Sequence, residues 1–403
     1  MNYLRIVLMC TIVVSLISCN NNRGKADNNI HAKYEINIDT LESQGIAFIS
    51  SYFKSVTPIF LETTDDCLIR YIDAVQVSKD YIFILDRSSR ALYTFNKDGK
   101  FMGKIGKVGS GPGEYNNISD FSIDKKNQVV YILDMQKSNI ASYDFKGKYI
   151  YSIPLDNEIR GKSGHIQFVN GRIYLDYGFF GTPTEKDTPL LVEINIRSGK
   201  ILKRYLSSKD DNIGFQLITF KDGSYFHLRN DETPGYIPSY SVIAYSISDN
   251  IEPLFQLKSK RIITKEDIQE LDLSNPGVIA DINTIMKVKS IRNIFEMDEN
   301  LICEYLDGYA MHTLVYSKIS NEAKLYDFFF DDLSYISTNN SLYHYFSCSD
   351  KMGLYAHLNI NDLPAFIDLY KNGFIKYKFN EEQLSIINDL SEDSNPVFFY
   401  YQY

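Results

Sequence analysis

The strongest constraint on the fold is an internal repeat. The segment IFILDRSSRALYTFNKDGKFMGKI (82–105) aligns without a gap on VYILDMQKSNIASYDFKGKYIYSI (130–153), and both copies carry a Leu-Asp pair, an aromatic residue and a Gly-Lys pair at equivalent positions. A period in the forties that is built from short β-rich runs is typical of a β-propeller blade, which is a sheet of four antiparallel strands.

One copy of the repeat contains four runs that we expect to form these strands: 74–78, 82–86, 91–96 and 100–105. The run 82–86 is almost wholly apolar, which is typical of a strand buried on both faces. The turn at 97–99 ends in a glycine, which adopts positive φ without strain and therefore suits a hairpin.

Fainter copies of the pattern begin near 170, 221, 298 and 341, so the sequence predicts an all-β, six-bladed β-propeller. In the fourth of the six copies, 221–229 aligns with the second strand of the blade. A single blade would expose both faces of its sheet, whereas blades stacked around an axis cover one another.

Three further segments complete this prediction. The stretch at about 263–288 is a helical insertion, since Thr264 and Asp267 have the spacing of a helix cap. The strand-like ends of the chain, 55–63 and 395–403, are expected to pair in the last blade and close the ring. A helical excursion at 379–390 precedes the C-terminal strand.

The segments DRSSRALYTFNKDGKFMGKIGKVGSGPGEY, VTPIFLET and NPVFFYYQY resemble the six-bladed β-propeller lipoproteins of Bacteroides-type bacteria, which are relatives of the NHL-repeat and TolB-like propellers. The resemblance covers about 33–403. It implies the propeller fold and export from the cytoplasm, and it implies no reaction.

The N-terminus is typical of an exported lipoprotein. Residues 1–18 contain one positive charge and a short apolar run, as in a signal peptide. The run is too short to span a bilayer. It ends in Leu-Ile-Ser before Cys19, a pattern that resembles the lipobox, so Cys19 is the predicted site of lipidation. Residues 19–32 are polar and predict a flexible tether, and Asn20 favours the outer membrane.

Charge and cysteine content exclude several classes of partner and site. The net charge is −9 and the chain has no Lys/Arg-rich run, so nucleic acid is not an expected partner and the lipid anchor is the only expected membrane contact. Cys67, Cys303 and Cys348 are far apart and odd in number, which predicts neither disulfides nor a zinc site. We expect them to be small buried side chains.

The glycine cluster in KIGKVGSGPGEY (104–115) is interpreted as a connector between two blades. A phosphate-binding loop would continue into a helix, whereas the residues after Gly113 predict a loop and a strand. Such a connector crosses from an outer strand to the next inner strand in irregular conformations, which favour glycine and proline.

No catalytic motif is present, and the scattered polar residues have structural interpretations. Asp86 and Asp134 recur at the end of the second strand, where each is expected to accept backbone N–H bonds in the following turn. His227 and His357 occupy similar places in the second strands of their copies. They could approach the axis and hold a metal, although satisfied or surface histidines are the simpler interpretation. A lactonase-like Ca²⁺ site would need several inward carboxylate and amide ligands, and the sequence does not gather them.

Two long segments are candidate contact loops for a ligand or partner: 178–189, with Phe179 and Phe180, and 229–240, with Tyr236 and Tyr240. The sequence therefore predicts a monomeric, non-catalytic binding or scaffold module of the cell envelope that contacts a protein, peptide or glycan. A metal-dependent propeller hydrolase or lyase and a glycan-binding accessory lipoprotein are the alternatives.

Overall fold

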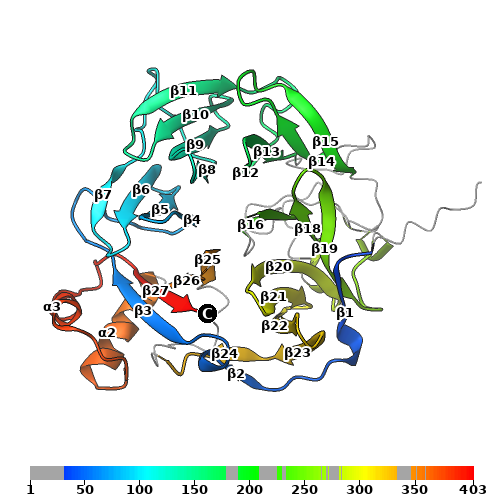
Figure 1. Ribbon diagram of the computed structural model, residues 1–403, viewed down its shortest axis with the longest axis vertical. Coiled ribbons are helices and arrows are strands. Elements are labelled where there is room, and N and C mark those ends of the chain that lie inside the picture. The colour runs from blue at the N-terminus through cyan, green and yellow to red at the C-terminus, as the bar shows by residue number, and fades with distance from the viewer. Residues whose placement is uncertain are drawn as a thin grey trace, which may run out of the picture. The chain divides into compact units, whose positions relative to one another are not determined.

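Six β-sheets stand around a central axis in the computed structural model, which confirms the all-β, six-bladed propeller (Figure 1). The structure describes residues 31–403 apart from 178–188, 208–224, 229–232, 265, 269–270, 272–280, 283, 334–345, 351 and 359. Within the described residues, none of the helices has the length and apolar character needed to cross a membrane.

The first three blades each come from one continuous stretch of chain. Blade one contains β4 (Ala74–Val77), β5 (Tyr81–Asp86), β6 (Ala91–Asn96) and β7 (Phe101–Lys104). Blade two contains β8 (Asp120–Asp124), β9 (Val129–Asp134), β10 (Asn139–Asp144) and β11 (Tyr149–Pro154). Blade three contains β12 (Ile166–Val169), β13 (Arg172–Asp176), β14 (Pro189–Ile194) and β15 (Ile201–Ser207).

Of the other three blades, the fourth and the sixth include a strand from the N-terminal part of the chain, whereas the fifth is continuous. Blade four has β16 (Tyr225–Leu228), β17 (Pro234–Ile237), β18 (Ile243–Ile247) and β19 (Ile251–Lys258), with β1 (Tyr34–Asn37) parallel to β19. Blade five has β20 (Val288–Glu296), β21 (Asn300–Asp307), β22 (Ala310–Ser317) and β23 (Glu322–Tyr326). Blade six has β25 (Phe346–Asp350), β26 (Gly353–His357), β27 (Val397–Gln402) and β3 (Ser55–Phe60).

The two repeat segments, 82–105 and 130–153, occupy equivalent strands of the adjacent blades one and two, as predicted. Tyr81 pairs with Asn96 at the start of the β5–β6 ladder, and Val129 pairs with Asp144 at the same place in blade two. The repeat in the sequence is therefore a repeat of strand register.

The glycine of each Gly-Lys pair makes a contact between neighbouring blades. Gly99, Gly147 and Gly199 all have positive φ, at +87°, +83° and +67°. A Cβ on Gly99 would lie 2.0 Å from the Phe60 carbonyl oxygen of blade six, and one on Gly199 would lie 1.7 Å from the Pro154 carbonyl oxygen of blade two. Only glycine allows each outer hairpin to approach the backbone of the preceding blade this closely.

The ring closes where the two ends of the chain meet, which confirms that prediction. Strand β3 pairs antiparallel with β27, from Ser55 opposite Gln402 to Phe60 opposite Val397. The first strand to be synthesised in this sheet is therefore its outermost strand, and the last one lies inside it.

The N-terminal segment 34–60 runs around the outside of three successive blades, and we call it the belt (Figure 1). After β1 on blade four it forms a 3-10 turn (Ile38–Thr40) and then β2 (Ile46–Phe48), which pairs in parallel with β24 (Phe328–Phe330). A second 3-10 turn (Ile49–Ser51) leads into β3. The belt thus covers sheet edges that would otherwise be open to pairing with another chain.

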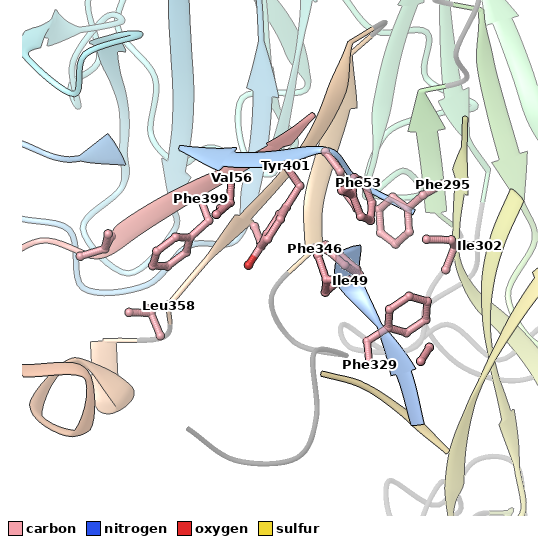
Figure 2. Packing of buried hydrophobic residues seen from close by; sticks show 14 of the residues in the cluster. Ile49, Phe53, Val56, Phe295, Ile302, Phe329, Phe346, Leu358, Phe399 and Tyr401 are labelled. Atoms are coloured by element: carbon pink, nitrogen blue, oxygen red, sulfur yellow. The ribbon is translucent and has the colours of Figure 1, made fainter. Parts of the chain in front are cut away.

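Hydrophobic layers between successive blades form the core. One large cluster lies between blades five and six and includes belt residues Ile49, Phe53 and Val56 against Phe399 and Tyr401 of the C-terminal strand (Figure 2). Separate clusters fill the seams between blades six and one, one and two, and two and three. Burying one such aromatic side chain contributes about 1.5–3 kcal/mol, so each seam contributes to the stability of the ring.

Blade six carries the predicted helical excursion as α3 (Glu381–Asp389), which begins with a capping box between Asn380 and Gln383. It also contains two elements that the sequence analysis missed, a 3-10 turn (Ile360–Asp362) and α2 (Leu363–Lys371). In the predicted insertion at 263–288 the structure describes a 3-10 turn (Glu266–Ile268), and Asp267 accepts a hydrogen bond from the Thr264 backbone N–H at 2.7 Å. Most of the remaining insertion lies outside the described residues.

Candidate functional site

A cavity of about 1270 Å³ lies on the axis of the ring, and we call it the channel. The inner strands of all six blades contribute to its lining; one residue from each is Val75, Ile123, Gln167, Phe226, Asn293 and Ser347. This volume exceeds the range of about 300–1,000 Å³ that is usual for small-molecule sites in proteins.

Side chains cross-link the inner strands of blades one, two and three. Gln76 donates to the Phe121 carbonyl at 2.8 Å and accepts from the Ile123 N–H at 3.1 Å. Asp120 and Ser122 accept the N–H groups of Ile166 and Phe168 at 3.0 and 2.9 Å. The neighbouring blade therefore satisfies these edge N–H groups, and the register shows that β8 and β12 run in the same direction.

Because β8 and β12 run in the same direction, their first residues lie at one end of the channel, which we call the mouth. Asp120 begins β8 and is 8% exposed, and His165 precedes β12 directly. Arg87 reaches the mouth from blade one, since its Nε donates to the Ser119 carbonyl at 2.8 Å. Its Nη1 lies 3.3 Å from Asp73 Oδ1. All four side chains line the cavity.

The imidazole of His165 is held by a buried carboxylate. Asp176 Oδ2 lies 2.9 Å from His165 Nδ1, while its Oδ1 accepts the backbone N–H groups of Gly164 and His165, both at 2.8 Å. Burial disfavours the imidazolium, but the adjacent Asp176 carboxylate outweighs this effect and raises the pKa of His165. The arrangement fixes both the tautomer and the orientation of the ring.

Blade five contributes an irregular part of the channel wall. Strand β20 contains two β-bulges, between Val288 and Ser290 and between Ile291 and Asn293. The side-chain amide of Asn293 donates a hydrogen bond to the carboxyl group of Glu304 in the next strand, β21, and Glu304 is only 2% exposed. Burial raises the pKa of Glu304 to about 8, although the hydrogen bond from Asn293 opposes the shift.

Comparison with known proteins places the chain in a family. Residues 33–402 match the family described as Domain of unknown function (DUF4934). The chain belongs to this family. No curated protein matches it.

Solved structures share the fold of this DUF4934 chain at low sequence identity. A candidate exported protein of Bacteroides fragilis aligns with a TM-score of 0.67 and 18% identity, covering 91% of this chain and 98% of the other. A member of the DUF4221 family from Bacteroides vulgatus aligns with a TM-score of 0.52 and 11% identity, covering 87% and 96%. These similarities establish the propeller architecture alone.

Of the two contact loops predicted for the DUF4934 chain, the structure describes the aromatic residues of the second only. Phe179 and Phe180 lie outside the described residues. Tyr236 lies in β17 and is 1% exposed, and its hydroxyl donates to the Leu190 carbonyl at 3.0 Å. The expectation that 229–240 is an exposed loop is wrong for these positions, because 234–237 form the second strand of blade four. Tyr240 is also buried, at 4% exposed, and lines the channel.

The predicted equivalence of the two histidines is wrong. His357 lies in a second strand, β26, but His227 lies in β16, the inner strand of blade four. The prediction that 221–229 contains the second strand of blade four is wrong, because Tyr225–Leu228 is its inner strand. His357 Nδ1 lies 2.6 Å from Ser347 Oγ, and burial lowers its pKa to about 4. Among the residues that the structure describes, no three His, Cys, Asp or Glu side chains are grouped to hold a metal ion.

The structural interpretation of the repeated aspartates is confirmed. Asp86 Oδ1 accepts the backbone N–H of Ser89 at 3.1 Å, and Asp134 Oδ1 accepts that of Lys137 at 3.0 Å. Both carboxylates are fully buried. They stabilise the turns that follow the second strands.

The connector prediction agrees with the structure, and the prediction of buried cysteines is confirmed for Cys67 and Cys303. The glycine cluster links β7 to β8, and Lys137 Nζ donates to the Gly109 carbonyl at 2.8 Å within that segment. Cys67, Cys303 and Cys348 are free thiols; the first two are buried and the third is partly buried.

Sequence reasoning missed the mouth residues Arg87, Asp120 and His165. One signal was available, since Asp73, Ser119 and His165 each stand directly before an inner strand and all three are polar. Inner strands of one direction bring such positions to a single end of the axis.

Proposed function

We propose that this protein is an exported, lipid-anchored module of the cell envelope that binds a small or extended polar ligand in its channel. The observation that carries the proposal is the channel itself, a large cavity with ordered polar groups at its mouth. Ligand sites are commonly concave, with a few polar groups whose positions are fixed by the surrounding structure.

The location in the envelope is supported by the signal-like residues 1–18 and by Cys19 in its lipobox-like context. The similar fold of a candidate exported protein of Bacteroides fragilis is consistent with this location. Two or more acyl chains on Cys19 would hold the protein stably on a membrane, whereas one chain would bind only reversibly.

Fractionation of cells that produce the full chain tests the location. The wild-type protein should sediment with the outer membrane, and the Cys19→Ala variant should be lost from it. A wild-type protein found in the soluble cytoplasmic fraction would contradict the proposal.

A matched pair of tryptophan variants tests the channel as the binding site. Lys126 lies on the channel lining in the β8–β9 hairpin, and Lys146 lies in the outer β10–β11 hairpin of the same blade. Each lysine is exposed, and its backbone N–H bonds to an aspartate two residues earlier, at 3.1 and 2.9 Å. The two substitutions should therefore perturb their turns to a similar degree.

The readout is native mass spectrometry of protein purified from the envelope, followed by identification of small molecules released on denaturation. We expect Lys146→Trp to retain the wild-type amount of bound ligand. Lys126→Trp should retain at most about a tenth of that amount. Equal occupancy in the two variants, or no small molecule in the wild type, would count against binding in the channel.

A further inference from the structure

The mouth of the channel contains an acidic side chain, Asp120, that lines the cavity. Asp73 and Arg87 form an ion pair and offset one another. Asp176 is held by His165, whereas Asp120 lines the cavity with 8% of its surface exposed. Burial raises the pKa of Asp120, against the opposing effect of His165 and Arg87, as expected for a carboxylate with too few cationic neighbours.

His165 adds a hydrogen-bond acceptor beside these carboxylates. Because its Nδ1 is bonded to Asp176, the neutral ring carries its proton there and has a lone pair on Nε2. About a third of the side chain is exposed, and the ring lines the cavity. The Ile166 N–H that bonds to Asp120 directly follows His165, so the two side chains are near neighbours.

Blades one, two and three share a buried aspartate at the end of the second strand that binds the backbone before the inner strand. Only in blade three does this aspartate also bind an imidazole, that of His165. In blades one and two the aspartate that ends the second strand uses its Oδ2 to accept a backbone N–H, from Arg70 for Asp86 and from Asn116 for Asp134, at 2.8 and 2.6 Å. In blade three Asp176 binds the equivalent backbone segment through Oδ1 and the ring of His165 through Oδ2. The scaffold does not require an imidazole, since blades one and two fold without one at this position.

We propose that the mouth binds a primary ammonium group of the channel's ligand, with His165 Nε2 and the Asp120 carboxylate as acceptors. An ammonium group has three N–H donors and no acceptor, which complements the two acceptors on His165 and Asp120. The inference deepens the proposed function and rests on the channel being the binding site.

The same groups disfavour the other simple ligands. A carboxylate or phosphate beside Asp120 would be repelled by that carboxylate, and Arg87 is already paired with Asp73. Arg292 of blade five also lines the cavity, so butyrate is included among the probes below. A divalent cation would need three or more ligands in one group, which the described part of the chain does not provide. A neutral alcohol would donate one hydrogen bond and leave the charge of Asp120 without a partner.

The pH dependence follows from the groups that face His165, which are Asp176 of β13, Asp120 of β8, Arg87 after β5 and Asp73 before β4. At low pH the imidazolium has no lone pair and repels a cation, while protonation of Asp120 removes the second acceptor. Ammonium binding should therefore weaken as the pH falls through the raised pKa of His165.

Histidine-selective NMR of the full-length protein tests the proposal, with the His165 resonance assigned from the His165→Gln spectrum. The probes are n-butylammonium chloride, sodium butyrate and n-butanol, each titrated to the same concentration at pH 8. We expect n-butylammonium to shift the His165 resonance saturably, with an apparent affinity at least tenfold above that of the other two probes. The affinity should fall at least tenfold between pH 8 and pH 5.

Two isosteric variants make the test specific. Asp120→Asn keeps an oxygen acceptor for the Ile166 N–H but removes the charge, and it should weaken n-butylammonium binding at least tenfold. Asp98→Asn makes the same charge change on the exposed outer hairpin of blade one and should bind as the wild type does. Equal weakening in both variants would overturn the proposal, as would stronger binding of butyrate or no response to any probe. A saturable shift caused by Ca²⁺ or Zn²⁺ at lower concentrations than n-butylammonium would identify a metal site and overturn it as well.

The two proposals fail separately. If the Lys126→Trp variant loses the native ligand while n-butylammonium leaves His165 unchanged, the channel binds a ligand of other chemistry and only the ammonium site is wrong. If the Lys126→Trp variant keeps the native ligand and n-butylammonium also leaves His165 unchanged, the channel is not a binding site.

Discussion

Blades one to three and blade six reach the same four-stranded sheet by different routes. In the first three, one continuous stretch supplies all four strands, and a buried aspartate fastens the chain at the end of the second strand. Blade six joins the two ends of the chain and inserts two helices between its second and third strands. The regular blades therefore depend on local turns and seams, whereas blade six depends on pairing between distant segments.

Deletion of 397–403, which removes β27, tests whether blade six depends on pairing between distant segments. Blade six would lose the strand between β26 and β3, and the seam cluster would lose Phe399 and Tyr401. We expect no cooperatively folded protein, measured as loss of the thermal unfolding transition by circular dichroism. A chain that begins at residue 41 lacks β1 but keeps β3, and it should remain folded. If both deletions are tolerated, ring closure is not required.

The regular blades are tested by Gly199→Ala with Gly171→Ala as its control. Both glycines have positive φ, but a Cβ on Gly199 would meet the Pro154 carbonyl whereas one on Gly171 meets nothing within 4 Å. Strain alone costs about 1–2 kcal/mol at either site. We expect Gly199→Ala to cost about 3–4 kcal/mol, because the outer hairpin must also move away from blade two. Similar free energies of unfolding for the two variants would show that the close contact is unimportant.

The irregular wall of blade five is expected to respond to pH through Glu304. Its folded pKa of about 8 exceeds the ordinary value of 4.5, so its contribution to stability is complete below pH 4.5 and is lost as the pH rises to 8. Glu304→Gln should therefore stabilise the protein by about 3 kcal/mol at pH 7 and by little at pH 4.5. Denaturant unfolding at both pH values measures this, with the exposed Glu299→Gln as the control. A stabilisation independent of pH would exclude the titration of Glu304 as its cause.

The smallest expected effect concerns the belt. The hydroxyls of Tyr52 and Tyr326 lie 2.9 Å apart and connect the belt to the last strand of blade five. Tyr52→Phe should cost about 1 kcal/mol in chemical denaturation, because one partly buried hydrogen bond is lost. A cost above 3 kcal/mol would mean that the belt is as important to stability as the closing strand.

The parts of the fold that were predictable from sequence are those with local signals. The repeat, the Gly-Lys hairpins and the strand-like ends of the chain located blades one, two and six. Blade four was displaced by one strand, because a Lys-Asp-Gly sequence before Tyr225 predicts an inner strand as well as a second strand. The Gly and Pro residues near Tyr236 were interpreted as a loop, although they form β17.

The candidate site was much less predictable. Asp120, His165 and Arg87 belong to three different blades. The polar residue directly before each inner strand is a local signal, but it does not indicate by itself that these side chains meet. Their juxtaposition follows from the ring and from the common direction of β8 and β12. The buried environment of Glu304 likewise depends on the packing of β21 behind the channel wall.

The pairing of β3 with β27 also sets an order of events during biogenesis. Ser55 and Gln402, which are hydrogen-bonded across this pair, are separated by 347 positions. A nascent chain emerging N-terminus first would carry β3 without its partner until nearly the whole polypeptide had been delivered. Contacts of such long range slow the final folding step. A chain that ends before β27 would leave the ring open, with unpaired strand edges in blade six that are accessible to proteases.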